Sequence, residues 1–112
     1  MMNKVCAFTG HRPSKLPWRY DEMDSRCVAL KTVLTEQITA LIEAGVTQFL
    51  SGMAEGTDIF CSEIVLALRE KNPAIKLHCI LPCTAQAEKW SVSSQELYRS
   101  ILGRADSVVY VS

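Results

Sequence analysis

The sequence predicts an α/β fold with a parallel sheet, built as a single domain over residues 1–112. Short apolar runs alternate with longer stretches in which apolar residues recur at helical spacing. Each short run is apolar enough to be covered on both faces, as the strands of parallel sheets are. A chain of 112 residues also suffices for one hydrophobic core without metal or disulfide staples.

The first half of the chain contains two expected strands with a helix between them. KVCAF at 4–8 is the first strand, and TQFL at 47–50 is the second. Helical spacing predicts a helix over 24–44, between a candidate N-cap at Asp24 and a stop at Gly45. The apolar positions expected on the buried face of this helix are Val28, Val33, Leu34, Ile38, Leu41 and Ile42.

The second half repeats the alternation. We expect a helix over 57–71, a strand over 75–81, a helix over 93–102 opened by a Ser-x-x-Glu capping box, and a strand over 107–111. Right-handed crossovers and the usual winding then predict a Rossmann-like three-layer sandwich with strand order 3-2-1-4. Such a fold binds ligands where the winding reverses, here between strands 1 and 4. Because the sequence ends there, we expect a longer protein or a partner copy to supply the other wall.

Composition excludes some classes of function. The formal net charge is zero, so there is no long-range basic field for wrapping duplex DNA. Residues 1–20 carry four cations and no acid, which suits an anionic ligand. The alternative is a chance run of basic residues on a solvated surface. No signal peptide or bilayer-length apolar run is evident, which predicts a cytoplasmic protein without membrane contact. The five cysteines lack metal-site spacing, so we expect reduced thiols and no metal.

Two loops carry the functional signal. TGHRP at 9–13 and SGMAEGTD at 51–58 each follow a strand and lead toward a helix, so they are expected to face one pocket. Glycines free backbone N–H groups, the second loop runs into a helix N-terminus that favours anions, and nearby hydroxyls suit phosphate oxygens. Glu55 and Asp58 oppose an anion there, and Asp58 is better read as a helix-start residue or a partner for a ribose hydroxyl. The alternative is that the glycines only permit two tight turns.

Missing motifs narrow the choice. There is no Gly-x-Gly-x-x-Gly, no Gly-Lys-Ser/Thr run and no Gly-x-Ser-x-Gly elbow, which argues against standard dinucleotide dehydrogenases, P-loop NTPases and serine hydrolases of that kind. Of the two histidines, His78 is expected to be a packed sheet residue. His11 is the better candidate for a ligand contact, although a capping role fits it equally well.

Four segments resemble a known family: TGHRPSKL, SGMAEGTDIFCSE, LPCTAQAEKW and YRSILGRADSVVYVS. They are similar to the YpsA-like family of bacterial and phage proteins in the SLOG superfamily, which also contains DprA and the LOG phosphoribohydrolases. The resemblance implies a Rossmann-like fold that binds a nucleotide or nucleotide-derived ligand at the strand ends. The ligand-binding residues carried over from the two loops and the segment after strand 3 are Thr9, Gly10, His11, Arg12, Ser51, Gly52, Met53, Ala54, Gly56, Thr57, Asp58 and Gln86; Trp90 of the same segment is expected to pack against the sheet.

The family pattern continues beyond the fourth strand into a second glycine-rich loop that this sequence does not contain. We therefore expect no enzymatic activity from this chain alone; were there one, it would be hydrolysis of a nucleotide N-glycosidic bond, assisted by Asp58 or Glu63. Binding of single-stranded nucleic acid, as by DprA, is the alternative function, because cations and aromatics interleave over 12–20. A homodimer through the exposed fourth strand is a further expectation.

Overall fold

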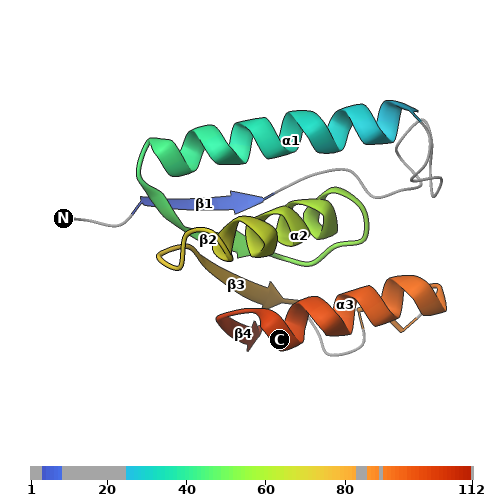
Figure 1. Cartoon of the computed structure of the whole chain (residues 1–112). Coiled ribbons are helices and arrows are strands. Elements are labelled where there is room, and N and C mark those ends of the chain that lie inside the picture. The colour runs from blue at the N-terminus through green and yellow to red at the C-terminus, as the bar shows by residue number, and fades with distance from the viewer. Residues whose placement is uncertain (1–3, 9–24, 83–85, 89, 112) are drawn as a thin grey trace.

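The computed structural model describes residues 4–8, 25–82, 86–88 and 90–111. It confirms an α/β chain with a parallel four-stranded sheet, as Figure 1 shows. The elements are β1 (Lys4–Phe8), α1 (Ser25–Glu43), β2 (Val46–Ser51), α2 (Thr57–Arg69), β3 (Lys76–Leu81), α3 (Val92–Arg104) and β4 (Ser107–Tyr110).

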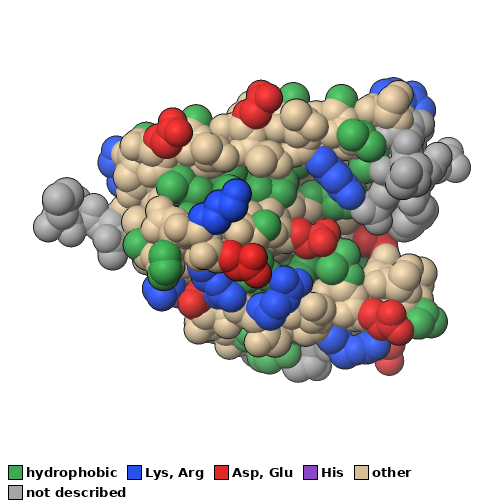
Figure 2. All heavy atoms as spheres, in the orientation of Figure 1, with side chains coloured by type: hydrophobic (Ala, Val, Ile, Leu, Met, Phe, Trp, Pro, Cys, Tyr) green, Lys and Arg blue, Asp and Glu red, His purple; other side chains and the backbone are tan. Residues whose placement is uncertain are grey.

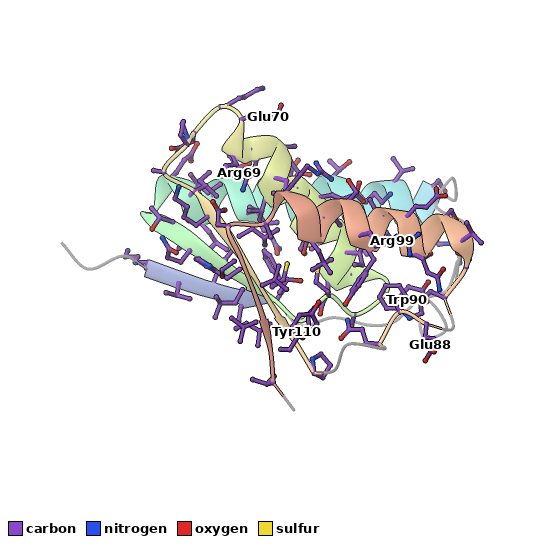
Figure 3. All side chains as sticks on the ribbon, turned by 90° about the horizontal axis from the view of Figure 1, so that it is seen from below. Arg69, Glu70, Glu88, Trp90, Arg99 and Tyr110 are labelled. Atoms are coloured by element: carbon purple, nitrogen blue, oxygen red, sulfur yellow. The ribbon has the colours of Figure 1, made fainter. Side chains whose placement is uncertain are left out.

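The strand order is β1-β2-β3-β4, so the predicted order 3-2-1-4 is wrong. The crevice expected between strands 1 and 4 is wrong with it, because these strands lie at opposite edges of the sheet. Each crossover moves one position in the same direction, and right-handed crossovers of that kind place their helices on one face. Figures 1 and 3 show α1, α2 and α3 together on that face. The described residues thus form two layers, a helix layer on one face of a sheet, instead of the three layers predicted. The alternation of parallel strands and helices remains compatible with a Rossmann-like sandwich.

Polar contacts that apolar periodicity does not reveal hold β4 beside β3. The backbone N–H of Asp106 donates to the carbonyl oxygen of Leu77 at 2.8 Å, and Asp106 Oδ2 accepts the N–H of Leu77 at 2.8 Å. The two ring nitrogens of His78 lie 2.6 Å from Ser107 Oγ and 2.6 Å from Gln48 Oε1. His78 is therefore a sheet residue, as expected, and it joins β2, β3 and β4.

The core lies between the sheet and α2, which contacts α1, α3, β2 and β3. Phe49, Val65 and Leu77 are all 0% exposed. The helix α1 is covered less completely: Val28 and Val33 are 50% and 46% exposed, although the sequence predicts them to be buried. Hydrophobic side chains accordingly show along α1 in Figure 2.

The helix ends differ in part from the prediction. Gly45 does follow α1, with φ 105° in the left-handed region that glycine tolerates. The capping box predicted at Ser93 and Glu96 is wrong: α3 begins at Val92, and the side chain of Ser91 accepts the N–H of Ser94 at 3.2 Å. In the described ranges, no helix is long and apolar enough to cross a bilayer.

Candidate functional site

The loop SGMAEGTD runs from the end of β2 into the first turn of α2. Phe8, the last residue of β1, pairs with Ser51 at the end of β2, so the carboxyl ends of these two parallel strands lie side by side. The strand ends from which the two loops start are therefore neighbours, as the sequence predicts. Of the first loop, Thr9, Gly10, His11 and Arg12 lie outside the described residues.

The Ser51 hydroxyl is used inside the protein. Ser51 is 1% exposed, and its Oγ accepts the backbone N–H of Met53 at 3.1 Å. The buried Ser62 hydroxyl, on the second turn of α2, lies 2.9 Å from Ser51 Oγ and 2.8 Å from the carbonyl oxygen of Asp58. Ser51 therefore fixes the loop to α2, and the phosphate-binding role predicted for its hydroxyl has no support in this geometry.

The backbone of the loop has two residues in the left-handed region. Gly56 has φ 101°, a conformation that a side chain would strain. Met53 has φ 59° and is 0% exposed, so its buried side chain holds a conformation that costs roughly 1 kcal/mol. Gly52 is different, because a Cβ there would meet Asp58 Oδ2 at 3.6 Å and the Ile80 carbonyl oxygen at 3.9 Å, both ordinary contacts. Neither backbone nor packing among the described residues requires glycine at 52.

Asp58 is the buried acid of the loop. It is 7% exposed although it lies in the first turn of α2. Its Oδ2 accepts the N–H of Ala54 at 3.3 Å, whereas its buried Oδ1 has no hydrogen-bond partner among the described residues. Burial raises the pKa of Asp58, and the hydrogen bond from Ala54 offsets only part of that rise. Among the described residues, no Lys or Arg forms an ion pair with the Asp58 carboxylate.

Gln86 reaches the loop from the segment after β3, as the sequence suggests. Its side-chain amide, predicted to contact a ligand, hydrogen-bonds to the loop backbone. Nε2 donates to the carbonyl oxygens of Gly52 at 3.0 Å and Met53 at 2.7 Å. Gln95 of α3 holds the Gln86 turn in the same way, donating to the carbonyl oxygens of Ala87 at 2.9 Å and Glu88 at 3.0 Å. Gln86 thus positions the loop backbone.

Trp90 packs against the hydrophobic core, and the ring contact it makes is with Tyr98 of α3, edge-on at 5.2 Å between centroids. Figure 3 shows Trp90 and Glu88 together at the end of the molecule away from Arg69.

Asp58 and Glu63, the alternative carboxylates for assisting a hydrolysis, do not share a face of α2. Five residues at ~100° each separate them by roughly 140° around α2. The hydroxyl of Ser62, at i+4 from Asp58, shares the face of Asp58 instead. Sequence analysis missed Ser62, for which the available signal was a serine inside an otherwise apolar run. In the described ranges no group of three His, Cys, Asp or Glu could hold a metal ion.

The fold and the loop together define an α/β protein in which a glycine loop leads from a parallel strand into a helix N-terminus. The sequence profile of the YspA SLOG family, named YpsA, matches residues 6–112. The chain belongs to that family, which confirms the resemblance noted in the sequence.

Relatives extend the comparison. A UPF0398 protein of Bacillus pumilus is 37% identical over 110 residues, which are 97% of this chain and 58% of that protein. A UPF0398 protein of Bacillus licheniformis is 33% identical over 104 residues, 92% of this chain and 56% of that protein. One from Halalkalibacterium halodurans is 31% identical over 105 residues, 94% of this chain and 55% of that protein. The chain therefore spans a little over half the length of these relatives.

Proposed function

We propose that the SGMAEGTD loop binds a nucleotide or a nucleotide-derived ligand. The observation that carries this proposal is the Asp58 carboxylate, whose Oδ1 is buried without a partner among the described residues. Buried polar side-chain atoms in native proteins are nearly always hydrogen-bonded. An ionised carboxylate only accepts hydrogen bonds, so any partner of Oδ1 must be a donor, and a ribose hydroxyl is a donor of suitable size.

The N-terminus of α2 supports the same ligand. The first N–H groups of a helix lack intrahelical partners and favour an anion. The ligand must therefore supply two groups to one loop: a hydroxyl that donates to Asp58, and an anion that accepts from the N-terminus of α2. A ribose phosphate supplies both, and it is the kind of ligand that the resemblance to the SLOG superfamily implies. Gly52 carries no side chain beside Asp58, where an added Cβ would lie 3.6 Å from Asp58 Oδ2.

The test is the melting temperature of the protein with AMP, ADP-ribose, NAD and cyclic nucleotides. A ligand at ~100 times its dissociation constant should add roughly 2.7 kcal/mol to the unfolding free energy. Gly52→Glu should abolish the shift, because it places a bulky anion against Asp58. Gly103→Glu is the matched control, since an added Cβ there meets nothing within 4 Å. A shift that survives Gly52→Glu would contradict the proposal.

Oligo-dT belongs in the same panel, because it tests the alternative of single-stranded nucleic-acid binding. Phosphate-backbone binding weakens steeply with salt. A shift with oligo-dT alone that disappears at higher salt would replace the nucleotide proposal with that alternative. We propose binding alone.

A further inference from the structure

We infer that the planar base of the ligand binds in an apolar cavity between β1, α1 and α2; this inference rests on the proposed function. The cavity has a volume of about 200 Å³. An apolar cavity of ~150 Å³ in another protein holds benzene, and sites for whole drug-sized ligands occupy roughly 300–1,000 Å³. The volume therefore suits one ring system rather than an entire nucleotide.

The lining of the cavity suits a ring. Its apolar walls are Phe8 of β1, Leu34, Ile38 and Leu41 of α1, and Cys61 of α2. Leu41 is 36% exposed, and the lining residue Gln37 beside it is also exposed, so the cavity reaches the surface along α1. Figure 2 shows hydrophobic side chains on the side of α1 that faces α2. The Gln37 amide lies at the rim, where it offers both a donor and an acceptor to the edge of a base.

The cavity adjoins the proposed polar site. Thr57 lines it and is the residue immediately before Asp58. Cys61 lies one turn further along α2, and burial, the charge of Asp58 and the nearby Cys6 thiol raise the pKa of Cys61 to about 12. The Asp58 carboxylate thus lies close enough to the cavity for its charge to affect the Cys61 thiol in the wall. Both thiols stay protonated at neutral pH, because the pKa of Cys6 is raised by burial as well, so the wall carries no charge.

A ligand placed along the first turn of α2 would therefore meet two environments in succession. Asp58 accepts hydrogen bonds from its hydroxyl groups, and the cavity takes its ring out of water. Each part makes its own contribution to affinity, so the two parts can be tested separately.

The experiment compares ribose 5-phosphate with the 5′-monophosphates of adenosine, guanosine, cytidine and uridine by isothermal titration calorimetry. At least one nucleotide should bind about tenfold or more tightly than ribose 5-phosphate, because it alone buries a ring. Leu41→Trp fills the cavity mouth and should bring the two affinities together without weakening ribose 5-phosphate. Val33→Trp is the matched control, since Val33 is exposed on the same helix and does not line the cavity.

The outcomes separate the two proposals. If a nucleotide binds and Leu41→Trp leaves its preference over ribose 5-phosphate unchanged, the cavity is not the base site, whereas the proposed function stands. If neither ribose 5-phosphate nor any nucleotide binds the wild type, the proposed function fails and this inference fails with it. Should Leu41→Trp lower the melting temperature, Gln37→Trp at the exposed rim repeats the test without touching a buried side chain.

Discussion

An aspartate lies beside each end of α2, and the two carboxylates differ in their hydrogen-bond and ion-pair partners. Asp106, near the C-terminal end, accepts the N–H of Leu77 at 2.8 Å and an N–H of Arg69 at 2.8 Å, and Lys76 Nζ lies 3.9 Å from it. Asp58, at the N-terminal end, has one hydrogen bond from Ala54 and an oxygen without a partner in the described part of the chain.

Their pKa values move apart for that reason. Partial burial alone would raise the pKa of Asp106, but the Leu77 N–H, the Arg69 guanidinium and Lys76 outweigh it and lower the pKa. Burial raises the pKa of Asp58, because only the Ala54 N–H opposes it. A carboxylate with satisfied partners contributes to stability, whereas a buried one left incomplete is a candidate for ligand binding. Three predictions test this contrast and the loop beside Asp58.

The largest effect is expected from Asp106→Ala. The substitution removes hydrogen bonds to a charged acceptor and leaves the Leu77 N–H without its carboxylate, so the unfolding free energy should fall by about 2–3 kcal/mol. Urea unfolding of the variant and the wild type at pH 7 measures this. A loss below about 0.5 kcal/mol would mean that Asp106 is a solvated surface acid, and the contrast with Asp58 would disappear.

A smaller effect is expected from Gln86→Ala, which removes the two hydrogen bonds that hold the carbonyl groups of Gly52 and Met53. Two neutral hydrogen bonds predict a loss of about 1–2 kcal/mol, together with weaker ligand binding as the loop loosens. Gln95→Ala is the control of matched chemistry, because it also removes two bonds to backbone carbonyl groups. Its stability loss should be similar and its effect on binding smaller, since it acts on the loop only through the Gln86 turn. Equal effects on binding would show that Gln86 has no special role in holding the loop.

Sequence periodicity predicted most elements and their type, because apolar spacing reports which residues are covered. It could not predict the strand order, which depends on polar contacts between distant residues such as His78 with Gln48 and Ser107. For the candidate site, the pattern placed the glycine loop between a strand and a helix and brought Gln86 into the segment after the third strand. It could not show that the Ser51 hydroxyl bonds inward or that Gln86 holds the loop backbone, because both follow from where β2, α2 and the turn after β3 meet in space.

The smallest effect is expected from Asp58→Asn, and its sign depends on pH. A raised pKa in the folded state means that ionised Asp58 opposes folding: its penalty is absent below the unfolded pKa of about 3.9 and is complete once the pH exceeds the folded pKa. Asn cannot ionise, so the variant should gain stability relative to wild type as the pH rises from 4 to 8, while staying within about 1 kcal/mol of it. Asp106→Asn should show the reverse dependence, and in a lower pH range: the lowered pKa of Asp106 makes its ionised form stabilising above the unfolded pKa of about 3.9, and this stabilisation of the wild type is lost as the pH falls from there through the folded pKa. Urea unfolding of both variants at several pH values measures the two slopes. Slopes of the same sign would mean that ionisation of Asp58 and of Asp106 affects stability in the same way. The Asp58 carboxylate would then no longer be a candidate for ligand binding.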